Sequence, residues 1–328
     1  MKLMKTVLAS AVAAVGILAG GAQAADMTIK FSHVVAENTP KGKMARKFEE
    51  LAEAAVPGLD VQVFPNSQLY DDSRVLEAML LGDVQIAAPS LSKFQRFTNK
   101  LQVFDLPFLF DDMAAVDRFQ QSEAGQSLLN SMEDKGLIGL GYLHNGMKQF
   151  SANEPILTPE DAAGKKFRIQ TSDILAAQFE AVDAIPVKKP FSEVFTLLQT
   201  KAIDGAENPW SNLYSKKFFE VQDYVTESNH GVLDYLVVTS ASFWNGLEPD
   251  VRDKLNKAMN EAIAYGNEQS ADLAARDRQA IIDDEGTKVV QMSAEQRQAW
   301  VEAEKPVWSE FEDDIGRDLI DAALKANQ

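Results

Sequence analysis

The feature that most constrains the fold of this chain is an alternation of strand-like and helix-like segments near its N-terminus. The segments follow one another as strand, helix, strand, helix and strand, at residues 27–33, 41–55, 59–64, 72–81 and 84–88. This order predicts an α/β lobe with a largely parallel sheet. Ligands of such sheets bind just beyond the carboxyl ends of the strands, which is where His33 and Ser90 fall.

The first 24 residues have the pattern of a secretory signal peptide. Lys2 and Lys5 form a positive n-region, residues 7–18 form an apolar core, and Ala22-Gln23-Ala24 forms a cleavage site. The apolar run is shorter than a membrane-spanning helix requires, and no stop-transfer pattern follows it. Because the sequence also lacks cysteine, we expect a secreted protein, most simply one of the bacterial periplasm.

The rest of the chain, about 300 residues, exceeds what one hydrophobic core usually organises, so two lobes are predicted. In chain order we expect lobe I, lobe II, and a region with a return strand, a long helix and C-terminal helices, at residues 25–145, 146–235 and 236–328. A segment after about residue 235 is expected to return to lobe I. An apolar stripe predicts the long helix at 249–282, and shorter helices are predicted at 123–135 and directly after Ser192, which is expected to cap the second of them.

The charge of the chain excludes one class of partner. The formal net charge is −17, and removal of Lys2 and Lys5 with the signal peptide, which holds no acid, takes it to −19. A strongly acidic protein does not bind nucleic acid through its phosphates. If such a chain binds an anion, it must concentrate its cations locally.

Two polar residues near strand ends suggest where an anion could bind. In residues 165–170, Phe167 and Ile169 share one face of a strand, which leaves Arg168 on the other face. Asn208 precedes Pro209, where a second strand must stop. A guanidinium and a carboxamide at the ends of two strands would suit a small carboxylate. On spacing alone, a solvated arginine and an ordinary turn asparagine remain open alternatives.

Several motifs, taken in order, resemble the solute-binding proteins of tripartite ATP-independent periplasmic (TRAP) transporters. They are His144 to Phe150, Thr158 to Arg168, Pro190 to Phe195, Asp204 to Trp210 and Ser228 to Gly231. The similarity covers nearly all of the chain after the signal peptide. It implies a two-lobe periplasmic-binding-protein fold of the α/β class, with a cleft between the lobes and a long helix spanning both.

The resemblance also implies roles for individual residues. Arg168 matches the arginine that pairs with the ligand carboxylate, and its planar fork suits that geometry. Asn208 matches the asparagine that binds the same carboxylate. Lys148 stands where the sialic-acid binders of the family carry a second arginine, and Ser90 stands where they carry a glutamate. These two departures argue against sialic acid and leave room for a small dianion.

Lys41 is the residue we expect to hold a distal carboxylate, because it begins the helix that follows the first strand. A solvated first-turn lysine is the open alternative. The remaining residues of the predicted ligand-binding set are His33, Thr171, Phe191, Trp210 and His230. Phe191 and Trp210 could equally be ordinary core side chains.

The sequence carries none of the common enzyme signatures, such as a Gly-x-Ser-x-Gly elbow, a His-Glu-x-x-His motif or a phosphate loop. We therefore expect a binding protein without nucleotide or metal cofactor that captures malate, succinate or fumarate and delivers it to TRAP membrane permease subunits. Two alternatives stay open. One is a binder of sugar acids, aromatic acids or keto acids. The other is a periplasmic enzyme acting on carboxylates, with His33 or His230 as its base.

Overall fold

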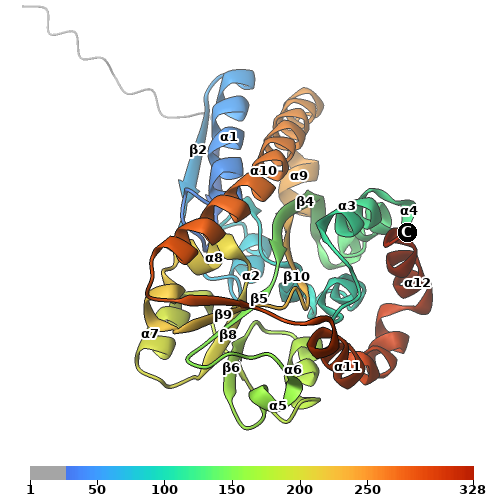
Figure 1. Cartoon of the computed structure of the whole chain (residues 1–328). Helices are drawn as coiled ribbons and strands as arrows, with labels where there is room; N and C mark the ends of the chain where they lie inside the picture. Colours follow the sequence, from blue (N-terminus) through green and yellow to red (C-terminus); the bar gives the residue numbers. More distant parts are fainter. Residues whose placement is uncertain (1–26) are drawn as a thin grey trace, which may run out of the picture.

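The computed structural model describes residues 27–328, so the predicted signal peptide lies outside the described residues. Two sheets form the framework (Figure 1), a five-stranded sheet in the order β2-β1-β3-β10-β4 and a six-stranded sheet in the order β11-β9-β5-β8-β6-β7. The strands are β1 Met27–Ser32, β2 Leu59–Phe64, β3 Ile86–Ala87, β4 Leu137–Met147, β5 Gln149–Ala152, β6 Lys166–Ile169, β7 Ile185–Lys188, β8 Gly205–Asn208, β9 Tyr224–Glu227, β10 Val232–Ser240 and β11 Lys288–Gln291.

Helices cover both sheets. The α-helices are α1 Pro40–Ala55, α2 Val75–Leu80, α3 Met113–Gln121, α4 Glu123–Leu128, α5 Pro159–Ala162, α6 Asp173–Glu180, α7 Val194–Gln199, α8 Trp210–Ser215, α9 Ala241–Gly246, α10 Pro249–Asp283, α11 Ala294–Ile315 and α12 Arg317–Ala326. None of the helices within residues 27–328 is both long and apolar enough to cross a bilayer.

The five-stranded sheet has a parallel part and an antiparallel part. Strand β1 pairs in parallel with β2 and β3, whereas β10 pairs antiparallel with β3 and β4. Helix α1 follows β1 because Thr39 caps it, accepting a hydrogen bond of 3.2 Å from the backbone N–H of Gly42, and Pro40 fits its first turn. The predicted order of strands and helices in this lobe is confirmed. The predicted parallel pairing is confirmed for β1, β2 and β3.

In the six-stranded sheet, the strands that matter most for function are adjacent. Strand β6 pairs in parallel with both β7 and β8, and Arg168 lies opposite Ala206. Parallel strands end at the same edge, so residues just beyond β6 and β8 lie close together. The other pairs join β5 antiparallel to β8 and β9, and β11 parallel to β9.

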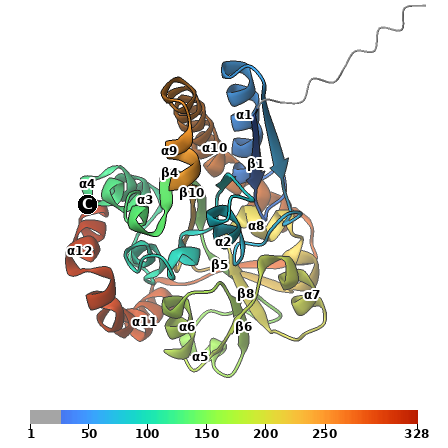
Figure 2. The same cartoon turned by 180° about the vertical axis from the view of Figure 1, so that it is seen from behind.

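The long helix α10 ties the two halves of the molecule together. It packs against α1 and β4 on one side and approaches α8 and β11 on the other (Figures 1 and 2). Gly266 permits the close contact, because a Cβ atom there would lie 2.7 Å from Leu143 Cδ1 and 2.9 Å from Met44 Cβ. The predicted helix spanning both lobes is thus confirmed.

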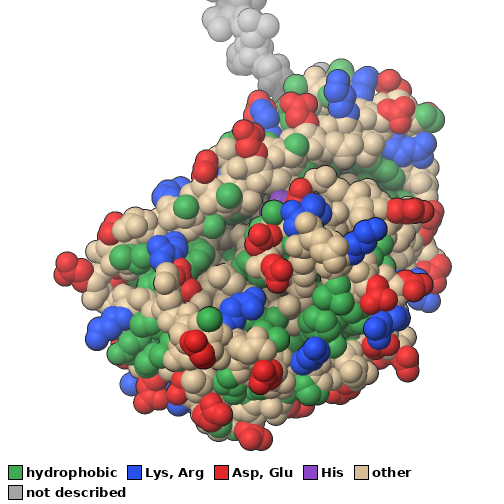
Figure 3. Space-filling view, turned by 45° about the vertical axis from the view of Figure 1, so that its right-hand side comes forward, with side chains coloured by type: hydrophobic (Ala, Val, Ile, Leu, Met, Phe, Trp, Pro, Cys, Tyr) green, Lys and Arg blue, Asp and Glu red, His purple; other side chains and the backbone are tan. Residues whose placement is uncertain are grey.

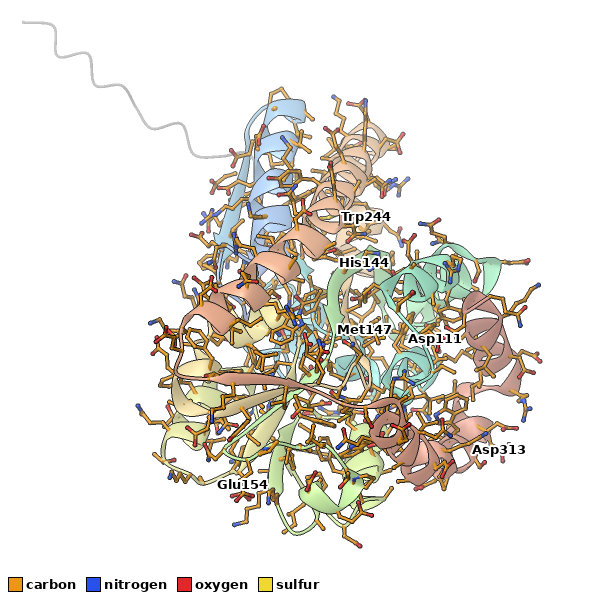
Figure 4. All side chains as sticks on the ribbon, in the orientation of Figure 1. Asp111, His144, Met147, Glu154, Trp244 and Asp313 are labelled. Carbon is orange, nitrogen blue, oxygen red and sulfur yellow. The ribbon has the colours of Figure 1, made fainter. Side chains whose placement is uncertain are left out.

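Two connections carry the chain between the sheets. Strand β4 belongs to the five-stranded sheet and β5 to the six-stranded one, and Lys148 alone separates them. Residues 228–231 carry the chain back from β9 to β10. In the view of Figure 4, Met147 lies near the middle of the molecule, between Trp244 in one half and Glu154 in the other.

Three local predictions differ from the structure. Helix α2 begins only at Val75, because Asp71 accepts hydrogen bonds from Ser73 in a turn that precedes it. The helix expected at 123–135 ends at Leu128 and is followed by a 3₁₀ turn that stops at Gly136, whose φ is 82°. Ser192 does not cap a helix, since it lies inside the 3₁₀ turn Phe191–Glu193 that precedes α7.

Candidate ligand-binding site

A cavity of about 110 Å³ lies between the two sheets. The half of the molecule that holds the five-stranded sheet lines it with Val34, Val35, Asp71, Asp72, Ser73, Ser90, Lys93, Leu233 and Tyr235. The half that holds the six-stranded sheet lines it with Arg168, Gln170, Thr171, Lys188, Lys189, Pro190, Phe191, Asn208 and Asn212. The cavity is smaller than the roughly 300–1,000 Å³ typical of drug-sized ligands.

Arg168 is the most unusual residue of this cavity. Its side chain is only 2% exposed, and its Nε donates a hydrogen bond of 2.9 Å to the carbonyl oxygen of Lys189. It forms no salt bridge with any residue of the described range 27–328. Burial lowers the pKa of the guanidinium to about 10, although the carboxylates of Glu207 and Asp72 oppose that shift. A buried cation without a counter-ion is costly, so this site is built for an anion.

Asn208 adds a hydrogen-bond donor beside the guanidinium. It is the last residue of β8, next to β6, which carries Arg168. Its Oδ1 accepts a hydrogen bond of 3.4 Å from Nδ2 of Asn212, while its own buried Nδ2 has no partner among the described residues. A buried amide N–H normally finds an acceptor. Asn208 and Arg168 therefore offer donors to one small volume.

Ser90 and Gln170 join the two sides of the cavity. The hydroxyl of Ser90 donates to Oε1 of Gln170, and both side chains are buried. This leaves Nε2 of Gln170 without a partner in the described part of the chain. Gln170 was not among the predicted site residues, although it lies on the same strand face as Arg168, two positions further on.

Lys93 is a second cavity residue that no pattern in the sequence predicted. It lies in the 3₁₀ helix Leu91–Phe94, directly after Ser90, and is half-buried. Its Nζ lies 3.4 Å from Oγ1 of Thr171, which lines the cavity from the other half of the molecule, and makes no salt bridge within residues 27–328. Burial, and next the charge of Arg168, lower the pKa of Lys93 to about 8.

Lys41 and His33 lie behind the cavity wall, which corrects the expectation that they face the ligand. The Lys41 ammonium is fully buried, 3.5 Å from the ring centroid of Tyr235, whose ring lines the cavity. Burial lowers the pKa of Lys41 to about 8. Both ring nitrogens of His33 are buried without partners in the described chain, and burial lowers its pKa to about 3, so the ring is neutral at pH 7.

Lys148 and His230 also lie outside the cavity lining, because both are paired with a buried carboxylate. Nζ of Lys148 lies 2.7 Å from Oε2 of Glu207, and Nε2 of His230 lies 2.9 Å from the same oxygen. His230 also contacts Oγ of Ser228 at 2.7 Å and stacks on Phe150. Burial alone would raise the pKa of Glu207, but these two neighbours lower it to about 2.

Trp210 is the fifth predicted residue that does not reach the cavity. It lines a separate hollow of about 200 Å³ between β4, α8 and α10, with Met147 and Ala271 nearby. The structure thus brings together five of the ten predicted residues, namely Ser90, Arg168, Thr171, Phe191 and Asn208. It places the other five outside the lining, namely His33, Lys41, Lys148, Trp210 and His230.

Comparison with known proteins decides the family. The sequence pattern of the bacterial extracellular solute-binding proteins, family 7, matches residues 31–314. The chain belongs to this family. The C4-dicarboxylate-binding periplasmic protein DctP of Shewanella loihica is 67% identical over 306 residues, which are 93% of this chain and 91% of that protein. The resemblance to TRAP solute-binding proteins found in the sequence is therefore confirmed.

Solved structures of family members share the fold. A TRAP periplasmic solute-binding protein of Shewanella oneidensis with bound succinate has a TM-score of 0.91 and 63% identity, covering 92% of this chain and 99% of that one. One from Pseudomonas aeruginosa with bound L-malate has a TM-score of 0.84 and 43% identity, covering 87% and 99%. The sugar acid binding protein of Advenella mimigardefordensis in complex with galactonate has a TM-score of 0.88 and 29% identity, covering 92% and 97%.

Charges are mixed on the outside of this solute-binding protein. In Figure 3, acidic and basic side chains are interspersed over the visible face, so no single-sign field marks the surface there. Within residues 27–328, no group of three or more His, Cys, Asp or Glu side chains is placed to hold a metal ion. Among the residues that line the cavity, Arg168 and Lys93 are the cations that form no salt bridge within residues 27–328.

Proposed function

We propose that this protein binds a small dicarboxylate of the malate, succinate or fumarate type in the periplasm and delivers it to the membrane permease of a TRAP transporter. The observation that carries the proposal is the buried guanidinium of Arg168, which lines the cavity without a salt bridge to any described residue. A carboxylate accepting from Arg168 and Asn208 would satisfy donors that otherwise remain unpaired.

The available donors are sufficient for useful affinity. A charge-assisted hydrogen bond contributes about 1.5–3 kcal/mol, and micromolar to nanomolar binding requires about 8–12 kcal/mol. Arg168, Asn208 and Gln170 supply several such bonds in a site shielded from water. Shielding matters because the same contacts are weaker in a high dielectric.

The size of the cavity favours a four-carbon acid over the sugar acids. A water molecule needs roughly 10–15 Å³ of accessible volume, so a cavity of about 110 Å³ holds a ligand of only several heavy atoms. The relatives with bound succinate and L-malate support the same choice. A galactonate-binding relative shows that larger ligands occur in the family, and sugar acids are therefore the alternative to test.

Binding requires the two sides of the cavity to come together. We propose that two lobes, one holding the five-stranded sheet with β10 and the other holding the six-stranded sheet, move about Lys148 and residues 228–231. Hydrogen bonds join the lobes, one at the cavity from Ser90 to Gln170 and one outside its lining, at 2.9 Å, from Lys216 Nζ to Oδ1 of Asn66. A ligand that bridges the lobes would stabilise this closed arrangement.

We propose binding without catalysis. Of the described histidines, His33, His144 and His230 all lie outside the cavity lining, so none is positioned there as a general base. A ligand recovered unchanged after long incubation with the protein supports this view. Conversion of malate into any product, absent with Arg168→Ala, would establish the enzymatic alternative.

The decisive experiment is isothermal titration of the mature protein with a panel of acids. Succinate, malate and fumarate are expected to bind with micromolar or tighter dissociation constants and to raise the melting temperature by mass action. Galactonate is expected to have no effect at the same concentrations. Binding of galactonate but not of the dicarboxylates would refute the ligand assignment. Fractionation of cells with an antibody tests the periplasmic location.

A further inference from the structure

We infer that Lys93 holds the second carboxylate of the ligand, opposite Arg168, and that this lysine makes the site select dianions over monoanions. The inference rests on the proposed function and adds to it the residue that recognises the distal charge. It replaces Lys41, which lies outside the cavity lining.

Geometry distinguishes Lys93 from the other lysines at the cavity. Lys188 and Lys189 also line it, but each forms a salt bridge on the same lobe, with Asp173 and with Glu193 respectively. Lys93 has no salt bridge within residues 27–328, and its closest polar contact is the hydroxyl of Thr171 at 3.4 Å. It is thus the cavity lysine with a free charge.

Lys93 and Arg168 face the cavity from different lobes. Lys93 follows β3 of the five-stranded sheet, whereas Arg168 lies on β6 of the six-stranded sheet. The charge of Arg168 contributes to the lowered pKa of Lys93, so the two cations repel each other across the cavity. A dianion would compensate both charges, whereas a monoanion would leave one of them without a partner.

The aspartates of the cavity do not cancel this charge. Asp71 accepts hydrogen bonds from the backbone and the hydroxyl of Ser73, and neither Asp71 nor Asp72 forms a salt bridge with Lys93 or Arg168. Lys41 is already placed against the negative face of the Tyr235 ring. The free positive charge that remains at the lining is that of Arg168 and Lys93.

Titration with two ligands of equal length tests the inference. Succinate carries two carboxylates, and its monoamide, succinamate, carries one. For Lys93→Met we expect the affinity for succinate to fall about 10- to 100-fold, which corresponds to the loss of one charge-assisted bond. The affinity for succinamate should change by less than about threefold, so the preference for the dianion collapses.

Four further variants keep the test decisive. Lys100→Met makes the same change of charge at an exposed residue outside the cavity, and should bind both ligands as the wild type does. Lys93→Arg should retain the preference for succinate, and Lys93→Gln replaces Lys93→Met should that variant fold poorly. Lys41→Met tests the alternative lysine.

The outcomes separate this inference from the proposed function. Wild-type affinity for succinate in Lys93→Met would overturn the inference alone, as would an equal loss for succinate and succinamate. Collapse of the dianion preference in Lys41→Met but not in Lys93→Met would also overturn it. A wild-type protein that binds neither succinate nor malate would instead refute the proposed function.

Discussion

The hydroxyl of Ser90 donates a hydrogen bond to Oε1 of Gln170, across the boundary between the two lobes. The bond fixes the orientation of the carboxamide, because its oxygen is occupied and its NH₂ group remains available. An anion favours the same orientation, since the reversed amide would present its oxygen to a carboxylate. This one hydrogen bond therefore both joins the two lobes and leaves the NH₂ group of Gln170 free to donate to a ligand.

Removal of this contact should weaken binding without unfolding the protein. We expect Ser90→Ala and Gln170→Ala each to cost about 1 kcal/mol of succinate affinity, the typical contribution of one neutral hydrogen bond. The double variant should cost less than the sum of the two, because the residues share one interaction. Titration calorimetry of all four proteins measures this coupling. Strictly additive losses would contradict a direct link between the two side chains.

Loss of the guanidinium should abolish tight binding and leave the fold intact. Arg168→Ala is expected to lose about 2–5 kcal/mol of ligand affinity, as truncation of one partner in a buried charged pair does. The melting temperature of the ligand-free protein should stay constant or rise, because a buried cation without a salt bridge is removed. Arg168→Lys keeps the charge but not the fork, and should bind at an intermediate level. A large fall in ligand-free stability would show that Arg168 has a structural role instead.

The buried Glu207 should make stability depend on acid pH. Lys148 and His230 outweigh burial and lower its folded pKa from 4.5 to about 2. A lowered folded pKa stabilises the protein above the ordinary value, so this contribution should fade as the pH falls from 4.5 towards 2. Urea unfolding at a series of pH values measures how the free energy of unfolding depends on pH. Glu207→Gln should be less stable at pH 7 and should lack this part of the slope, whereas an unchanged slope would contradict the assignment.

The buried His144 should make the protein less stable as the pH becomes alkaline. Burial alone would lower its pKa, but the carboxylates of Asp234 and Asp117 raise it from 6.5 to about 9. Nδ1 of His144 lies 2.8 Å from Asp234, which is fully buried. A raised folded pKa stabilises the protein below 6.5, and the contribution is lost as the pH rises through about 9. NMR titration of the ring and unfolding at pH 6 and 9 test this, with His144→Gln as the control that removes the effect.

Local sequence patterns were informative wherever the physics is local. The alternation around Phe167 identified the strand face that carries Arg168, and Ser293 with Gln296, at the spacing of a capping box, forms that box at the start of α11. The hydrophobic periodicity of a strand and the capping of a helix depend on residues only a few positions apart, so strands and helix starts of this kind can be predicted from the sequence. The 3₁₀ helix that presents Lys93 has no comparable pattern, and that residue was missed.

The sequence by itself determined the α/β class and the family, because these follow from periodicity and from motifs of fixed spacing. Together with the family resemblance, it also predicted Arg168 and Asn208 as ligand-binding residues. Only the tertiary structure decided which charged side chains meet at the cavity. Lys148 carries the same charge as Lys93, but Glu207 pairs with Lys148 and not with Lys93, and that pairing takes Lys148 out of the cavity lining. Which carboxylate a buried cation meets depends on how distant segments of the chain pack. Because burial of an unpaired charge is costly, a buried cation without a protein partner is stabilised by binding an anionic ligand.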